Sequence, residues 1–140
     1  MIMKVVIDSN VFISLYFETE KFHKTAKKIY EKILLREIEP ISSVLMLPEI
    51  CGGISRRIGR ERAKEVRIEI ENLIRKGILK LEEINFERMN SASNLAIDLQ
   101  IKGSDSIFVS LAKEFKIPFL TFDEEIKKKI KHKIKLFELK

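Results

Sequence analysis

The alternation of apolar and polar positions along this chain predicts short buried strands separated by amphipathic helices. Residues 5–7 form a continuous β-branched run, which is typical of a strand covered on both faces. The run stops at Asp8, and apolar residues return at helical spacing over residues 11–16. The first strand therefore ends on a carboxylate, directly before a helix.

Similar patterns continue to the end of the chain. Pro40 indicates a second strand that is short or near an edge of its sheet, and Ser42 or Ser43 can cap the following helix. Gly77 is placed to end the long, highly charged helix before it. We expect further strands at residues 38–41, 78–81, 118–121 and 134–139, and helices at 23–35, 44–54, 60–75, 85–99, from 103 and after 123.

Strands that alternate with helices need crossover connections, and these are right-handed and leave the strands parallel. The expected fold class is therefore α/β, a three-layer α/β/α sandwich with a short, mainly parallel central sheet. No internal repeat, low-complexity segment or linker divides the sequence, so we expect a single domain over residues 1–140.

Composition narrows the class of protein without identifying its function. Hydrophobic residues make up 45% of the 140 residues and charged residues 34%, as in soluble globular domains. No apolar stretch approaches the roughly 20 residues that span a membrane, so no membrane association is expected. The single cysteine, Cys51, excludes an intrachain disulfide framework, fits a cytoplasmic location and is expected to be buried. The formal net charge of +6 favours polyanionic partners.

Four acidic residues stand where a parallel sheet would bind a ligand. In open α/β sheets, ligands bind beyond the carboxyl ends of the strands. Asp8 ends the first strand, Asp123 follows the strand at 118–121, and Asp105 begins the helix before that strand. Glu49 lies on the helix after the second strand, in the otherwise apolar segment LMLPEICGG.

Each acid alone also has a structural explanation, because aspartate in the first turn of a helix commonly caps unsatisfied backbone amides. Several aspartates at one sheet edge would repel one another, however, by about 4 kcal/mol for a pair about 4 Å apart at an effective dielectric near 20. The aspartate motifs themselves contain no lysine or arginine to offset this repulsion. A hard divalent cation with oxygen ligands, Mg²⁺ or Mn²⁺, is the simplest counter-charge.

Four segments in this order resemble the PIN domain, and specifically the small ribonuclease toxins of the VapC type. They are VVIDSNVFI, LPEI, GSDSIFVSLAKEF and IPFLTFDEEI, and the similarity covers residues 4–126. The resemblance implies that the catalytic residues are Asp8, Glu49, Asp105 and Asp123. The three aspartates would be metal ligands, and Glu49 would act through a metal-bound water or a second ion.

The resemblance also implies an activity and partners. Ser9, Asn10 and Thr121 match polar positions that support the acids, although capping and turn formation would explain them equally well. The implied reaction is endonucleolytic hydrolysis of RNA, in which Mg²⁺ or Mn²⁺ polarises the phosphate and Glu49 or Asp123 orients or deprotonates the water. VapC-type toxins form homodimers and are silenced by a small antitoxin protein, so both are expected here.

Arginines gather in the segment SRRIGRERAKEVR, after the helix that carries Glu49. The planar guanidinium forms bidentate hydrogen bonds to phosphate, which makes these residues candidates for RNA binding: Arg56, Arg57, Arg60 and Arg62. A solvated helix face with interspersed glutamates would explain the same segment. Aromatic residues fit the core better than an exposed base-stacking surface, and we place there Phe12, Phe86, Phe108 and Phe119.

Proteins of other functional classes also begin with a strand that ends on an aspartate. A phosphatase of the haloacid dehalogenase type needs a second aspartate two residues after the first, where this chain has Asn10. A phosphoacceptor receiver domain needs an acidic pair in the first loop and a late lysine, and Asp8 and Thr121 do not match it. Two alternatives stay open: a non-catalytic RNA-binding or scaffold module with a PIN-like fold, and a PIN nuclease of RNA processing without an antitoxin. Non-catalytic modules usually lose one or more of the acids, and all four are present here.

Overall fold

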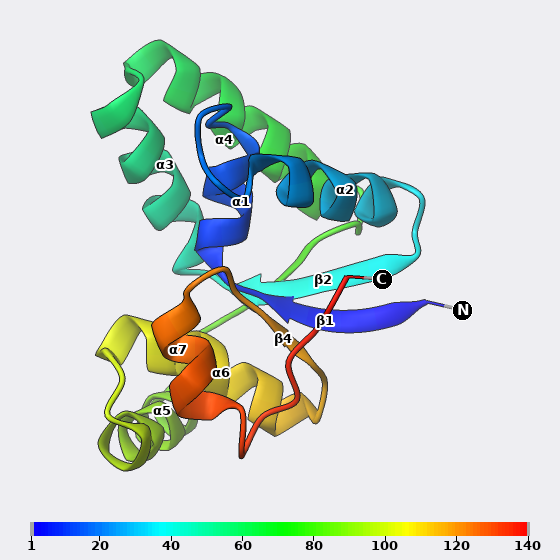
Figure 1. Ribbon diagram of the computed structural model, residues 1–140. Coiled ribbons are helices and arrows are strands. Elements are labelled where there is room, and N and C mark those ends of the chain that lie inside the picture. The colour runs from blue at the N-terminus through cyan, green and yellow to red at the C-terminus, as the bar shows by residue number, and fades with distance from the viewer. Residues whose placement is uncertain (1, 140) are drawn as a thin grey trace.

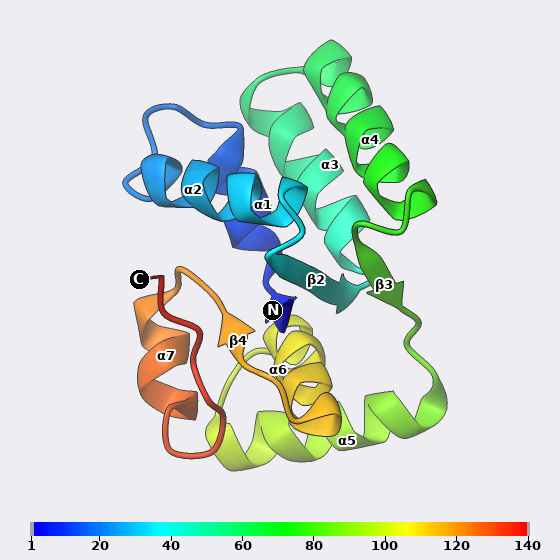
Figure 2. The same ribbon diagram turned by 90° about the vertical axis from the view of Figure 1, so that its right-hand side faces the viewer.

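Four parallel strands form the central sheet of the structure, a computed structural model that describes residues 2–139 (Figures 1 and 2). Their order across the sheet is β3-β2-β1-β4, so the first strand is an interior one. Every strand pair is parallel, which confirms the expected sheet. The strands are β1 (Met3–Ile7), β2 (Ile38–Ser43), β3 (Lys80–Glu82) and β4 (Phe119–Leu120).

Helices cover both faces of this sheet and confirm the three-layer sandwich (Figure 1). One face carries α1 (Ser9–Leu15), α2 (His23–Leu34), α3 (Met46–Arg57) and α4 (Arg60–Arg75). The other face carries α5 (Phe86–Leu99), α6 (Gly103–Phe115) and α7 (Glu124–Ile130). Because β1 has a helical layer on each side, Val5, Val6 and Ile7 are all 0% exposed.

The register of the sheet brings the ends of neighbouring strands to one edge. Ile7, the last residue of β1, lies opposite Leu120, the last residue of β4. The backbone N–H of Asp8 donates to the carbonyl of Leu120 at 2.9 Å, and Ser42 Oγ of β2 donates to the carbonyl of Ile7 at 2.8 Å. Asp8 and Thr121, which follow their strands directly, therefore lie side by side at the carboxyl edge.

The second strand is longer and more central than the sequence pattern predicted. Pro40 is tolerated inside the sheet because β3 pairs only with the last three residues of β2, so Pro40 faces a partner strand on one side only. The predicted serine cap of the next helix is also wrong. Ser42 and Ser43 belong to β2, α3 begins at Met46, and Ser43 Oγ accepts the N–H of Leu45 at 3.1 Å instead.

Other expectations need smaller corrections. The closing strand at residues 134–139 is reduced to one bridge between Leu136 and Phe119. Cys51 is half-buried rather than buried. Phe86 was expected in the core but is 83% exposed, because it lies about 120° around α5 from the buried Ala92. None of the helices within residues 2–139 combines the length and apolarity that a membrane crossing requires.

Candidate active site

Asp8 lies at the carboxyl end of β1 in a hydrogen-bond network that fixes its side chain. Asp8 is only 4% exposed, and Asp8 Oδ2 accepts hydrogen bonds from Thr121 Oγ1 at 2.9 Å and Asn10 Nδ2 at 3.3 Å. Thr121 Oγ1 in turn accepts from Asn10 Nδ2 at 3.0 Å and from the backbone N–H of Asp123 at 3.2 Å. One threonine hydroxyl thus joins the end of β1 to the loop after β4.

The two residues after Asp8 have separate tasks. Ser9 Oγ donates a 2.9 Å hydrogen bond to Glu49 Oε1, which joins the start of α1 to the first turn of α3. Asn10 Oδ1 accepts the backbone N–H of Phe122 at 3.2 Å and so holds the loop after β4. The side chain of Asp8 makes no capping hydrogen bond to α1, so helix capping does not account for this aspartate.

Asp105 and Asp123 approach the same edge from the other helical layer. Asp105 lies in the first turn of α6, Asp123 lies directly before α7, and both line a cavity of about 130 Å³. Asp123 is exposed, and its Oδ1 accepts the backbone N–H groups of Glu125 at 2.9 Å and Ile126 at 3.1 Å. Capping therefore does explain part of the position of Asp123, although these bonds use only one of its oxygens.

Burial and mutual repulsion raise the pKa of three of these acids. Burial is the main cause that raises the pKa of Asp8 from 3.8 to about 7; the charges of Asp105 and Glu49 add to it, and the Thr121 hydrogen bond opposes it. Burial also raises the pKa of Glu49, with a contribution from Asp105, and the pKa of Asp105, with a contribution from Asp123. Asp105 thus interacts with each of the other three acids, and their role in catalysis stays a prediction.

Basic side chains lie near this cluster without forming direct ion pairs to its acids within residues 2–139. In the part of the chain from residue 2 to residue 139, none of the four acids forms an ion pair. Lys102 lowers the pKa of Asp105, and the sequence prediction missed this residue although it stands three positions before Asp105. Lys102 thus offsets part of the negative charge at Asp105, and a bound cation would offset more.

A hard divalent cation fits the donor set, because all four side chains offer carboxylate oxygens. No three acidic, histidine or cysteine side chains within residues 2–139 converge closely enough to form a closed ligand group. Mg²⁺ is usually held by only one or two carboxylates and keeps several waters, so an open cluster suits it better than a closed cage would.

The four candidate RNA-binding arginines do not share one surface. Arg56 and Arg57 end α3 and line a cleft of about 510 Å³ between α1 and α3, which Glu49 also lines. Arg60 lines a different cavity, of about 560 Å³, between α3 and α4. Arg62 forms ion pairs within α4, at 3.7 Å from Glu65. Only the first two arginines therefore share a cleft with one of the four acids, Glu49.

Residues 5–131 of this chain match the PIN domain family. Ribonuclease VapC6 of Methanocaldococcus jannaschii is 25% identical to it over 139 residues, which cover 89% of this chain and 91% of that protein.

Solved structures share the fold at lower sequence identity. VapC20 of Mycobacterium tuberculosis, described as a toxin that cleaves the sarcin-ricin loop, matches 96% of this chain and 99% of its own with a TM-score of 0.75 at 16% identity. A toxin–antitoxin complex from Klebsiella pneumoniae matches 90% of this chain and 89% of its own, with a TM-score of 0.62 at 15% identity. VapBC2 of Rickettsia felis, bound to promoter DNA, matches 90% and 92% with a TM-score of 0.64 at 14% identity. These similarities confirm the fold class.

Proposed function

This chain belongs to the PIN domain family, and we propose that it is a metal-dependent endoribonuclease that serves as the toxin of a toxin–antitoxin pair. One observation carries the proposal. The buried carboxylate of Asp8 stands at the sheet edge beside Glu49 and Asp105, and burial with repulsion raises its pKa to about 7. Such a cluster opposes folding, and strongly perturbed acids of this kind gather at functional sites.

The relatives supply the substrate class and the partner in this proposal. The curated relative is a ribonuclease, and one structural relative is a toxin that cleaves the sarcin-ricin loop. A second structural relative is a toxin–antitoxin complex, and a third is VapBC2 bound to a DNA fragment from its promoter. We therefore propose RNA as the substrate and a small antitoxin protein as the inhibitor. A homodimer and a cytoplasmic location, both implied by the resemblance, stay predictions.

The metal in this proposal is Mg²⁺ or Mn²⁺, held by Asp8, Asp105 and Asp123 with Glu49 beside them. When bound, the ion supplies Lewis-acid polarisation of the scissile phosphate and lowers the pKa of the attacking water. Support comes from the chemistry of the donors, which are all carboxylates, and from the lack of any ion pair to them within residues 2–139.

The side chains of the chain itself then position the reactants. Thr121 and Asn10 orient Asp8 by donating hydrogen bonds to Oδ2. Ser9 holds Glu49, and a carboxylate with a raised pKa is a better acceptor for a proton from water. Water attacks phosphorus directly, a new P–O bond forms, and the bond to the leaving oxygen of the next nucleotide breaks. No covalent bond to the protein is required.

Cleavage of a labelled structured RNA tests the proposal. We expect cleavage with Mg²⁺ or Mn²⁺, none with EDTA, and a loss of at least about 100-fold for Asp8→Asn or Asp105→Asn, as is usual for groups that stabilise a transition state. Asp98→Asn, a change of an exposed aspartate on α5, is the matched control and should retain full activity. Full activity in both site variants would overturn the assignment.

A further inference from the structure

The cleft between α1 and α3, called the α3 cleft below, is continuous with the acidic cluster but ends on positive charge. We propose that it holds one nucleotide of a single-stranded RNA next to the scissile phosphate, with Arg56 binding the phosphate of that nucleotide. This subsite rests on the ribonuclease function proposed above. Ser9 and Glu49 line one part of the α3 cleft, and Arg56 and Arg57 line another.

The acids are bordered by two cavities of very different size. The α3 cleft has a volume of about 510 Å³, within the range of about 300–1,000 Å³ that is typical of sites for small organic ligands. The cavity lined by Asp105 and Asp123 has about 130 Å³, enough for a few waters of about 30 Å³ each. Of these two cavities, only the α3 cleft has the volume for a base with its sugar, so we place the nucleotide on the α3 side.

The walls of the α3 cleft suit a nucleobase. Ile13 and Leu45 are half-buried and Pro48 is exposed, so these three residues present apolar surface to solvent. A base in a duplex keeps its faces stacked inside the helix, whereas an unpaired base can place a face against a protein surface. Single-stranded RNA, or an unpaired loop in a folded RNA, is therefore the form that the subsite accepts.

The two arginines of the α3 cleft differ in availability. Arg57 is already engaged, because its guanidinium pairs with Glu20 at 2.7 Å and lies 3.8 Å above the ring of Phe17. Arg56 is exposed, and its side chain forms no hydrogen bond or ion pair with any residue from 2 to 139. Its Nη1 passes beside Gly52, only 3.2 Å from where a Cβ atom would stand. Arg57 thus shapes the wall, and Arg56 is the cation free to bind phosphate.

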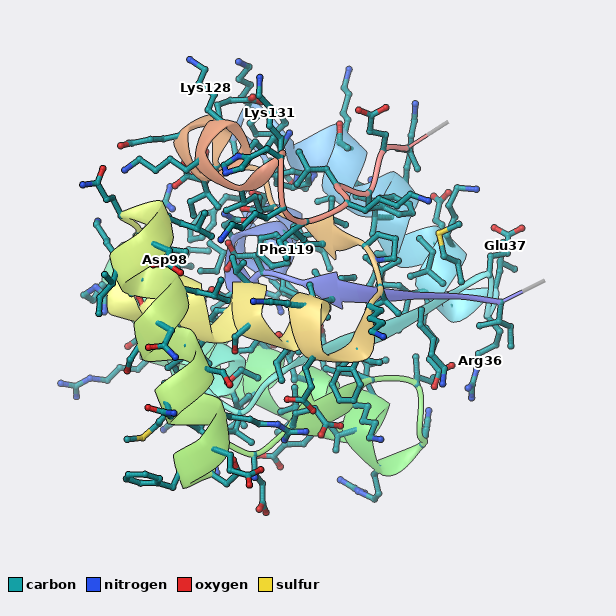
Figure 3. The ribbon with its side chains drawn as sticks, turned by 90° about the horizontal axis from the view of Figure 1, so that it is seen from below. Arg36, Glu37, Asp98, Phe119, Lys128 and Lys131 are labelled. Carbon is teal, nitrogen blue, oxygen red and sulfur yellow. The ribbon has the colours of Figure 1, made fainter. Side chains whose placement is uncertain are left out.

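Binding of RNA by an inactive protein tests this subsite separately from catalysis. The background variant is Asp8→Asn, and the probe is a fluorescent single-stranded RNA of about ten nucleotides, followed by anisotropy. Adding Arg56→Ala should weaken binding about tenfold, as expected for one charge-assisted contact, and should lower the salt slope by about 0.7. Arg36→Ala is the matched control, because Arg36 is exposed and lies at the opposite edge of the sheet, beside the start of β1 (Figure 3). The control should change affinity less than about twofold.

A second measurement identifies which phosphate Arg56 contacts. Single neutral methylphosphonate groups are placed in turn along the RNA. At one position next to the scissile bond, the neutral group should cost the Asp8→Asn protein about tenfold in affinity but should cost the Asp8→Asn, Arg56→Ala protein almost nothing. Equal penalties in both proteins, or equal affinities of Arg56→Ala and Arg36→Ala, would overturn the subsite while leaving the nuclease proposal intact. Absence of any metal-dependent cleavage by the unmodified protein would instead overturn the nuclease proposal.

Discussion

Replacing Asp8 by asparagine should make this protein more stable at neutral and alkaline pH. The folded protein raises the pKa of Asp8 from 3.8 to about 7, chiefly through burial, so the folded state binds a proton more tightly than the unfolded state does. For an acid whose pKa is raised by folding, stability is highest below pH 4 and is lost as the pH rises towards 7. A pKa difference of about 3 corresponds to about 4 kcal/mol of lost stability at pH 8.

The asparagine variant should recover only part of this loss. Its amide oxygen can still accept the hydrogen bond of Thr121, but its NH₂ group brings a new donor into a buried position. A buried donor without an acceptor costs about 1–3 kcal/mol. We therefore expect a net gain of about 2 kcal/mol at pH 8, or roughly 6 °C in Tm, and a gain near zero or slightly negative at pH 4.

Urea unfolding of both proteins between pH 4 and pH 8, without divalent ions, measures the difference directly. Asp98→Asn is the control, because Asp98 lies exposed on the outer side of α5 (Figure 3) and its change should not alter the free energy of unfolding. Millimolar Mg²⁺ should reduce the difference in free energy of unfolding between the Asp8→Asn variant and the unmodified protein, because an ion that binds only the folded unmodified protein stabilises that protein alone. A gap that is the same at pH 4 and pH 8 would refute the reasoning, because it would mean that ionisation of Asp8 does not oppose folding.

Three further substitutions separate support, packing and capping. Thr121→Val should lower the free energy of unfolding by about 1–3 kcal/mol, measured with urea, because it removes the hydrogen bond to Asp8. Thr121→Ser keeps the hydroxyl and should retain most of that stability. Equal losses in both variants would contradict a role for the hydroxyl. Gly53→Ala should raise the free energy of unfolding by about 0.5–1 kcal/mol, since the new Cβ would lie at an ordinary contact distance of 3.5 Å from Ile13. The added methyl group also narrows the α3 cleft and should weaken RNA binding. Unchanged RNA binding would count against the subsite. Asp123→Asn should retain the cap of α7 and lose cleavage, whereas Asp123→Ala should also lose about 1 kcal/mol of stability. Full cleavage activity in Asp123→Asn would mean that Asp123 only caps α7 and does not take part in the reaction.

The ends of two strands could be predicted from the sequence, and with them the positions of Asp8 and Thr121. The β-branched run before Asp8 and the apolar strand before Thr121 both stop abruptly, and parallel strands bring their carboxyl ends to one edge. Glu49 could be placed only because an acid stood in an apolar segment that resembles the PIN domain. The sequence pattern could not predict which polar side chain bonds to which acid: Ser9 donates to Glu49, whereas Thr121 donates to Asp8.

The arginine segment shows why neighbours in sequence need not be neighbours in a site. Arg57 and Arg60 are three residues apart, but Gly59 adopts a φ of +142° between them and the chain turns from α3 into α4. Arg56 and Arg57 stay beside the acids, and Arg60 moves to the far side of α3. The position of that turn depends on how α4 packs against α3, which periodicity in a single helix does not reveal.

The signs of the expected changes distinguish three kinds of residue around one sheet edge. Removing the charge of Asp8 should raise stability and abolish cleavage, because the charge opposes folding and serves the metal. Removing the hydroxyl of Thr121 should lower both, because it stabilises the fold and the ionised form of Asp8 together. Removing Arg56 should weaken RNA binding without changing stability, since its side chain forms no bond within residues 2–139 that folding could lose. A buried aspartate with only a structural role would give the gain in stability but leave cleavage unchanged, so the two changes together identify a residue that serves the reaction.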